Sequence, residues 1–529
     1  MQADEIGDFG MPALATPTST ASPHEEAVPH LPVPPEDTEI ALYFGPQRRW
    51  VLLTVPISLI LTAGTLYLFS TRSPALWPFL AALTLNLVGW LLSLVDGQRQ
   101  RSTSWESHEL LVRSWQPARV PSVDVFIPTR GEPLAILRNT FTYIAAMHWN
   151  GPLTVWVLDD AGRADVEELA AEHGFRYTAR PDRGHLKKAG NLNHGLTLSD
   201  GELVAVFDAD FCPRPDFLFH LAPYLEDPNI AIAQSPQYFD TDATMNWLER
   251  TAAASQELFY RWLQPSRDAD GGAICVGTNV LYRRSDLERI GGFPKIDHSE
   301  DIYTSVALMR HGLRTKYVPV LLAKGLSPDN VAAYISQQYR WAMGCLSLLF
   351  SRDFHATPMG WRVRVSYWCG FLSYFVSALN IVAVPLPGLI MLYLYPDEVQ
   401  AWHMIPFLGP LWIALVLLPS VSVSRWRFEV IRVQTLYAYC HLIAIWHALR
   451  DQAAAWVPSG AGGARSRLVS QVGWLALIWL SATTAATWIG IALQAPVHGW
   501  GDYWAMTAFA IATSYIALPL IRDLWRTLR

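Results

Sequence analysis

The sequence predicts an α/β domain with a mostly parallel central sheet, inserted between transmembrane helices. The chain has 529 residues, of which 51% are hydrophobic and only 16% charged, and its mean hydropathy is +0.17. This composition is too apolar for an ordinary soluble enzyme and indicates a membrane protein. Charge-free runs long enough to span a bilayer lie on both sides of a central region. Within residues 120–350, short Val- and Ile-rich runs alternate with helix-like stretches, which is typical of a parallel sheet covered on both faces.

Charge and cysteine content exclude two further classes of protein. The formal net charge of −6 provides no basic surface for nucleic acid. The five cysteines show neither CxxC nor Cys/His spacing, so no zinc site or disulfide framework is expected.

Residues 1–45 are expected to form a disordered tail. The first forty positions contain no Lys or Arg and are rich in Pro, Ala and Thr. They also lack an apolar run behind a basic start, so they are not expected to be a signal peptide.

Two membrane spans are expected before the central domain and four after it. The first two begin at Trp50 and Ala75 and form a hairpin over residues 46–98. Residues 351–529 are expected to hold interfacial helices and the other four spans, which begin at Val365, Trp402, Leu468 and Tyr503. The charged segment 424–452 is expected to lie in the membrane interface, with a tilted span as the alternative.

Arginines indicate the orientation of these spans. They gather on one side, as at Arg48, Arg101, Arg364 and Arg526, whereas the short loops of the other side hold only Arg72. By the positive-inside rule both termini and the central domain, residues 99–350, are cytoplasmic. We therefore expect a multi-pass protein of the inner (plasma) membrane.

Acidic residues follow three of the expected strands. The runs VDVFIP, LTVWVL and ELVAVF end at the sequences TRGE, DDAG and DAD. Ligands of open α/β sheets bind beyond the carboxyl ends of the strands, so the three clusters are expected to converge at one edge of the sheet.

Asp208 and Asp210 are the candidate metal ligands. Side chains two residues apart in an extended segment project to the same side, and two carboxylates suit Mg²⁺ or Mn²⁺ that takes its other ligands from phosphates and water. A turn or helix cap is the commoner role of a lone DxD, but the neighbouring acidic clusters favour the metal.

Other polar residues fit a nucleotide site. Asp160, at the end of the second strand, can accept hydrogen bonds from a base or ribose, although a turn role is equally consistent. Lys188 can hold a diphosphate or sugar hydroxyls, with a solvated helix start as the alternative. Asp301 lies beside Glu300 in the first turn of an expected helix, whose N-terminus would lower carboxylate pKa values. A helix cap is the alternative role for an acid there. To act as a general base, the Asp301 carboxylate must lie within hydrogen-bond reach of the hydroxyl group that it deprotonates.

Eight motifs together resemble one family. The sequences VDVFIPTRGE, DDAG, KAGN, FDAD, GTNVLYRR, GGF, SED and QQYRW occur in the order and spacing of the processive inverting sugar-nucleotide transferases. Over residues of about 45 to 450 the chain closely resembles bacterial cellulose synthase catalytic subunits, of glycosyltransferase family 2. Each motif alone is weak, but eight in order between matching membrane helices are specific.

The resemblance implies a GT-A type domain that uses a UDP-sugar, with UDP-glucose the first choice. Asp160 would contact the uracil, Asp208 and Asp210 the diphosphate and its metal, and Asp301 would be the general base. The substrate-binding residues implied are Thr129, Glu132, Asp160, Lys188 and the Q-x-x-R-W residues Gln337, Arg340 and Trp341. An interfacial anchor would be the usual role of a solitary Trp at this place. Cys275 and Thr278 are second-rank candidates near the acceptor.

The resemblance implies a processive, inverting enzyme that polymerises the sugar into a beta-linked glucan such as cellulose and extrudes it. Its partners would be the UDP-sugar donor, the growing polysaccharide and the lipid membrane. Accessory export subunits are possible further partners, and nucleic acid is not expected as a partner. The open alternatives are a beta-1,3 or mixed-linkage glucan, a mannan or amino-sugar polymer, transfer to a lipid phosphate, and a non-catalytic transport or assembly scaffold.

Three features depart from the family pattern. Arg130 stands where an aromatic residue is expected to face the uracil, although a guanidinium can also stack on a base. The sequence AWVPSGAGGARS after Arg450 replaces a gating loop of Phe-x-Val-Thr type. Since no regulatory beta-barrel motif is found, activity independent of cyclic-di-GMP is expected.

Overall fold

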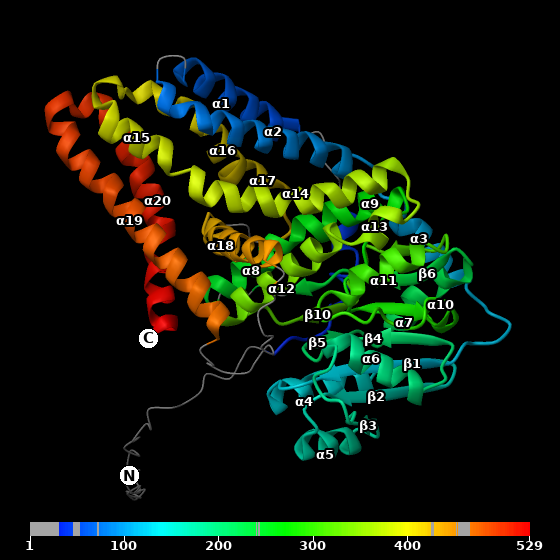
Figure 1. Cartoon of the computed structure of the whole chain (residues 1–529). Helices are drawn as coiled ribbons and strands as arrows, with labels where there is room; N and C mark the ends of the chain where they lie inside the picture. The colour runs from blue at the N-terminus through cyan, green and yellow to red at the C-terminus, as the bar shows by residue number, and fades with distance from the viewer. Residues whose placement is uncertain are drawn as a thin grey trace, which may run out of the picture. The chain divides into compact units, whose positions relative to one another are not determined.

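The computed structural model describes residues 31–45, 53–70, 73–239, 241, 244–424, 428–450, 452 and 466–529. Residues 1–30 of the expected tail, and residues 453–465 with most of the sequence that replaces the gating loop, lie outside these ranges. Every element below belongs to one compact unit, Pro32–Arg529 (Figure 1).

A seven-stranded sheet forms the centre of the α/β domain, in the order β3-β2-β1-β4-β8-β6-β9. Only β8 runs antiparallel to its neighbours, so the mostly parallel sheet predicted from the strand pattern is confirmed. The strands are β1 (Val123–Thr129), β2 (Leu153–Asp159), β3 (Arg176–Thr178), β4 (Leu203–Val206), β6 (Ile230–Gln234), β8 (Val280–Arg283) and β9 (Arg314–Tyr317). A smaller sheet has the order β5-β10-β7, from β5 (Phe211–Pro213), β10 (Ala323–Gly325) and β7 (Tyr238–Phe239).

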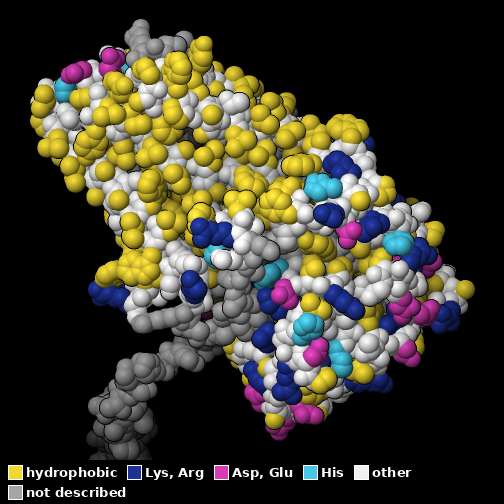
Figure 2. All heavy atoms as spheres, viewed as in Figure 1, with side chains coloured by type: hydrophobic (Ala, Val, Ile, Leu, Met, Phe, Trp, Pro, Cys, Tyr) yellow, Lys and Arg dark blue, Asp and Glu magenta, His cyan; other side chains and the backbone are white. Residues whose placement is uncertain are grey.

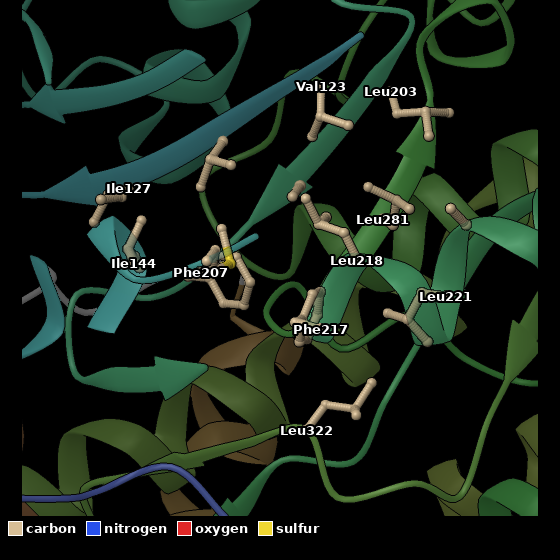
Figure 3. Packing of buried hydrophobic residues seen from close by; sticks show 14 of the residues in the cluster. Val123, Ile127, Ile144, Leu203, Phe207, Phe217, Leu218, Leu221, Leu281 and Leu322 are labelled. Atoms are coloured by element: carbon tan, nitrogen blue, oxygen red, sulfur yellow. The ribbon is translucent and has the colours of Figure 1, made fainter. Parts of the chain in front are cut away.

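Helices cover both faces of the large sheet, which explains why its strands are apolar at successive positions. Val125 and Ile127 of β1 belong to a core with side chains of α4 and α7, whereas Phe126 packs on the other face with α6 and α11. Figure 3 shows the first core, with Val123, Ile127, Ile144, Leu203, Phe207, Phe217, Leu218, Leu221, Leu281 and Leu322 labelled. The domain's helices are α3 (Trp105–Ser114), α4 (Leu134–Ala145), α5 (Ala164–Glu172), α6 (Lys187–Leu198), α7 (Phe217–Leu221), α8 (Trp247–Leu258), α9 (Gln264–Ala269), α10 (Arg284–Arg289), α11 (Glu300–Met309), α12 (Val331–Leu349) and α13 (Arg352–Ala356).

The remaining helices form an apolar bundle before and after this domain. They are α1 (Thr54–Ser70), α2 (Trp77–Gly97), α14 (Trp361–Ala383), α15 (Leu386–Leu394), α16 (Leu408–Trp412), α17 (Leu418–Val421), α18 (Val430–Leu449), α19 (Arg467–His498) and α20 (Trp500–Leu528). Hydrophobic side chains cover this part of the surface in Figure 2, while the charged side chains gather on the α/β domain. Large exposed apolar residues such as Leu61, Ile478 and Trp504 belong to this bundle, as expected of a multi-pass membrane protein.

The prediction of two membrane spans before the domain and four after it was wrong. In the part of the chain that the structure describes, four stretches are long and apolar enough to cross a bilayer, one before the domain and three after it: Pro74–Gly97, Trp361–Leu394, Arg467–His498 and Trp500–Leu528. The described helix α1 has only 17 residues. The expected span from Trp402 is divided into short helical pieces with a π-helical turn at Ile413–Leu417, and Pro419 follows without a backbone N–H to donate.

Helix α18, from the segment expected at the membrane interface, packs against α8, α12, α14 and α19. Val433, Leu436, Cys440 and Ala444 are among its buried residues. Helix α18 therefore joins the bundle to the helix that carries the QQYRW sequence.

Residues 32–45, expected to belong to the disordered tail, pack against the α/β domain instead. Ile40 and Phe44 are buried in the core that covers one face of the large sheet. Glu39 forms an ion pair of 2.8 Å with Lys324 of β10, and Arg214 binds Asp37 at 2.7 Å. The high proline content of this segment hid these contacts, because its three acids and few apolar residues give no periodic signal.

Candidate active site

A pocket of about 240 Å³ opens where strands β1, β2 and β4 end. All ten site residues chosen from the sequence line it: Thr129, Glu132, Asp160, Lys188, Asp208, Asp210, Asp301, Gln337, Arg340 and Trp341. The parallel register explains the convergence, because Thr129 of β1 pairs with Asp159 of β2 and each strand then turns toward the same edge. The structure thus brings the selected side chains together, while the role of each is a separate proposal.

The two aspartates after β2 have different surroundings. Asp159 accepts hydrogen bonds from the backbone N–H of Ala161 at 3.0 Å and of Arg163 at 2.7 Å, so it stabilises the turn. Asp160 reaches the pocket and accepts from Arg180 Nε at 2.6 Å. Only Asp160 is therefore available to a ligand.

Arg180 was missed by the sequence analysis. Its side chain is only 1% exposed, and besides Asp160 it binds the carbonyl oxygens of His185 at 2.5 Å and Lys187 at 3.1 Å. Arg180 therefore fixes both the Asp160 carboxylate and the loop that leads into α6. It follows a three-residue strand and belongs to no motif, so the sequence offered no signal for it.

Lys188 contacts the group of acids at the centre of the pocket, Asp208, Asp210, Glu300 and Asp301, which we call the acidic centre. Its Nζ donates to Asp208 Oδ1 at 2.5 Å and to the Gly277 carbonyl at 2.8 Å, and it lies 3.9 Å from Glu300 Oε1. Burial alone would lower the pKa of Lys188, but Asp208 and Glu300 outweigh it and raise that pKa. Lys188 is consequently a fixed positive charge.

Asp210 is a buried acid of the pocket that lies near other carboxyl groups. Burial, and then the charges of Asp208 and Glu132, raise the pKa of Asp210 to about 7. Burial also raises the pKa of Glu132, although its Oε2 accepts hydrogen bonds from the N–H groups of Arg130 at 2.8 Å and Gly131 at 3.1 Å. Three crowded carboxyl groups favour the binding of a cation.

Asp208 and Asp210 fit a divalent ion that takes most of its ligands from elsewhere. Among the described residues, no group of three or more His, Cys, Asp or Glu side chains is arranged to hold a metal by itself. Mg²⁺ and Mn²⁺ bound with a nucleotide need only one or two carboxylates, and the repulsion on Asp210 is the kind that such an ion relieves.

Asp301 lies in the first turn of α11, within the acidic centre. Burial, and then the charge of Glu300, raise the pKa of Asp301 to about 7. The expectation that the helix N-terminus lowers this pKa was wrong, because burial outweighs the hydrogen bond of 2.8 Å that Asp301 Oδ1 accepts from the Ile302 N–H. Gly277 has φ of 76°, and a Cβ there would stand 3.1 Å from Asp301 Oδ2. The backbone thus approaches the carboxylate closely.

Helix α12 presents the QQYRW side chains to two different surroundings. Gln337, Arg340 and Trp341 line the pocket. Tyr339 is buried on another face of α12, where its hydroxyl lies 2.8 Å from His447 Nδ1 of α18. Burial lowers the pKa of Arg340, and the nearby acids Asp208, Asp210 and Glu300 oppose that shift.

The second-rank candidates differ from these residues. Cys275 is buried, does not line the pocket, and its sulfur lies 3.1 Å from the Tyr282 hydroxyl. Thr278 accepts a hydrogen bond of 2.9 Å from the backbone N–H of Asp208. Thr278 therefore supports Asp208, whereas Cys275 is a small buried side chain.

Left-handed backbone marks the edges of the pocket. Among the described residues, the non-glycine residues with positive φ are Leu186, Lys187, Asn279 and Ser299. Leu186 and Lys187 directly precede Lys188. Asn279 follows Thr278, and Ser299 precedes Glu300. Such conformations persist where surrounding structure enforces them, often at functional sites. Leu and Lys give no composition signal for this conformation, so the sequence did not reveal it.

Comparison with known proteins finds relatives for the part of the chain that forms the pocket. Residues 121–344 match the model of the family described as glycosyltransferase like family 2. The cellulose synthase catalytic subunit [UDP-forming] of Pseudomonas fluorescens (strain SBW25) is 34% identical over 307 residues, which are 56% of this chain and 41% of that protein. Its counterpart from Xanthomonas axonopodis pv. citri (strain 306) is 36% identical over 229 residues, 42% of this chain and 31% of that protein. The chain thus spans less than half the length of these relatives.

A mannosyltransferase from Pyrobaculum calidifontis, in complex with GDP-Man and Mn²⁺, is similar at a TM-score of 0.49 and 18% identity, over 70% of this chain and 99% of that one. That likeness gives no information on the substrate of this protein. The sequence matches define the relationship instead. Residues 121–344 match the family described as glycosyltransferase like family 2, and the chain is similar to bacterial cellulose synthase catalytic subunits.

Proposed function

We propose that the protein is a processive, inverting glycosyltransferase of the inner membrane that polymerises a UDP-sugar, with UDP-glucose the first choice, into a beta-linked glucan such as cellulose and extrudes it. The observation that supports this most is the shared pocket of Asp208, Asp210, Asp301 and Trp341. A GT-A type domain on the cytoplasmic side and a polysaccharide path through the bundle are parts of the same proposal.

The donor would lie along the strand ends. Asp160, fixed by Arg180, would accept a hydrogen bond from the uracil, and Arg130, 3.6 Å from Asp160, would stack on the base. Thr129 and Glu132 would line this end of the site. The diphosphate would then extend toward Lys188 and the acidic centre.

Asp208 and Asp210 would hold Mg²⁺ or Mn²⁺ together with the diphosphate. When bound, the ion supplies positive charge that compensates the leaving diphosphate. Lys188 keeps Asp208 oriented, and Arg340 adds a further fixed cation on the side of α12.

Asp301 would act as the general base. Its carboxylate would accept the proton of the acceptor hydroxyl while that oxygen forms a bond to the anomeric carbon and the bond from this carbon to the diphosphate breaks. One carboxylate suffices for this inversion, whereas a retaining mechanism built on two acids needs the second across the bond.

Trp341 would hold the growing end of the polymer. An indole offers a flat apolar face to a pyranose ring, and Gln337, one turn earlier on α12, can bind sugar hydroxyls. Trp341 and Asp301 line the same pocket, which supports an acceptor that stacks on the indole and presents its hydroxyl to the base.

Other polymers of the same chemistry stay open, because donor choice rests on a few hydrogen bonds that the motifs do not specify. Membranes containing the protein should be incubated with labelled UDP-glucose, UDP-GlcNAc or GDP-mannose and Mg²⁺, and the insoluble product digested with linkage-specific hydrolases. We expect polymer from UDP-glucose that a beta-1,4-glucanase degrades. If polymer forms only from another donor, that donor's sugar replaces glucose in the proposal. If no donor gives polymer, the result supports the alternative of a non-catalytic scaffold.

A further inference from the structure

A second lysine in the pocket differs from its neighbours in how its charge is compensated. Lys187 lines the pocket beside Lys188, and its Nζ lies 3.3 Å from His298 Nε2. In the described part of the chain, Lys187 forms no ion pair with a carboxylate, whereas Lys188 binds Asp208 and Arg130 approaches Asp160. Lys187 therefore brings positive charge that no carboxylate among the described residues neutralises by a direct ion pair.

His298 holds Lys187 without adding charge. Burial, and then the Lys187 charge itself, lower the pKa of His298 to about 4, so its imidazole is neutral near pH 7 and can accept a hydrogen bond from the ammonium. The Lys187 and His298 pair thus bears one net positive charge. Of the other titratable groups nearby, Asp297 favours the charged form of Lys187, and Arg340 and Arg130 disfavour it.

Lys187 shares the pocket with residues at both ends of the proposed donor site. Arg130 stands beside Asp160 at the end proposed for the base, and Arg340 lies on α12 at the end proposed for transfer. Lys187 interacts electrostatically with both arginines, and burial, followed by the charges of Arg340 and Arg130, lowers the pKa of Lys187. An anion placed among the three would remove the repulsion.

The local backbone directs Lys187 to this place. Leu186 and Lys187 have φ of 52° and 46°, and Arg180 holds the preceding loop through the carbonyl oxygens of His185 and Lys187. Helix α6 begins at Lys187, and its residues Lys187, Lys188 and Asn191 line the pocket. The partial positive charge of a helix N-terminus therefore adds to that of the side chain.

We infer that Lys187, held by His298, binds the diphosphate of the donor and is a substrate-binding residue in addition to Lys188. The inference rests on the proposed use of a nucleoside diphosphate sugar. A diphosphate joins the base to the sugar, so it would lie along the line from Arg130 to Arg340 and meet the Lys187 ammonium.

Equilibrium binding to the full chain in detergent tests this inference, with UDP and uridine as probes in separate titrations. We expect Lys187→Met to weaken UDP binding by about 10-fold or more, the usual effect of losing a charge-assisted hydrogen bond, and to leave uridine binding unchanged. Lys187→Arg should recover most of the UDP affinity. Lys295→Met, at an exposed lysine on the loop that leads to His298, should bind UDP like the unsubstituted protein.

Three results would overturn the inference. UDP binding by Lys187→Met at full strength would show that the charge faces no phosphate. Equal losses for UDP and uridine would mean that the substitution disturbs the pocket as a whole. A loss seen with UDP-glucuronate but not with UDP would assign Lys187 to a sugar carboxylate instead. By contrast, an unsubstituted protein that binds neither UDP nor GDP would contradict the proposed function itself.

Discussion

Gly344 of α12 lies directly against Ser299, the residue before α11, so closely that a Cβ at Gly344 would stand 1.7 Å from Ser299 Oγ. This contact fixes the helix that carries Trp341 against the N-terminus of α11, the helix that carries Asp301. A glycine is needed here because the Ser299 side chain occupies the space that a Cβ would take.

Gly344→Ala should therefore move α12 away from α11. We expect a loss of about 1–3 kcal/mol of stability, the usual cost of overpacking, and a larger loss of transfer activity than of UDP binding. Gly370→Ala in α14, where a Cβ would meet nothing within 4 Å, is the matched control. Thermal unfolding and a polymer assay on both variants check this, and equal behaviour of the two alanines would contradict it.

The buried carboxyl group of Asp301 should make the protein less stable as the pH rises. Its pKa in the folded protein is raised to about 7, above the ordinary value, so its favourable contribution is lost as the pH rises through about 7. Asp301→Asn should then raise the melting temperature more at pH 8 than at pH 5. Asp353→Asn, at an exposed carboxylate, is the control, and an equal shift of Asp301→Asn at both pH values would refute the argument.

Removal of divalent metal should weaken donor binding. With EDTA in place of Mg²⁺ or Mn²⁺, we expect UDP affinity to fall by roughly 10-fold or more, because two crowded carboxylates then face the diphosphate. Asp208→Asn should bind UDP weakly with or without metal, whereas Asp165→Asn, at an exposed position, should keep the metal dependence. Metal-independent UDP binding by the unsubstituted protein would argue against the metal site.

The segment of residues 32–45 should contribute to the stability of the pocket. Lys324 is buried and pairs with Glu39, and its strand β10 lies beside β5 and β7, which bring Phe211 and Phe239 to the pocket. Glu39→Gln removes the carboxylate that pairs with this buried ammonium and should cost about 3 kcal/mol. Glu109→Gln, from an exposed pair with Arg113, should cost less than about 0.5 kcal/mol. Denaturant unfolding of both variants compares the two losses, and similar losses would mean that the segment does not support the domain.

The sequence predicted those features that follow from a repeated physical pattern. Alternating apolar runs indicated a parallel sheet, and the carboxyl ends of its strands then brought Asp160, Asp208 and Asp210 to one edge. The number of spans could not be predicted in the same way, because hydropathy does not show that the stretch around Gly409 and Pro419 is divided into short pieces.

Residues that act through long-range contacts were also beyond sequence reasoning. Arg180 and Lys187 belong to no periodic pattern, and a folded loop with left-handed backbone at Leu186 and Lys187 places them at the pocket. The raised pKa of Asp301 likewise depends on burial and on Glu300, whereas the sequence showed only a helix N-terminus.

Asp301 provides the most direct test of the proposed chemistry. Asp301→Asn keeps the size of the side chain but removes the carboxylate that would accept the proton of the acceptor hydroxyl. Polymer formation and UDP binding should be measured side by side on this variant and on Asp353→Asn. We predict that Asp301→Asn binds UDP normally and makes polymer at less than about one hundredth of the normal rate, as expected when a general base is lost. Polymer formation at the normal rate by Asp301→Asn would contradict the assignment of the base, and with it the proposed reaction in this pocket.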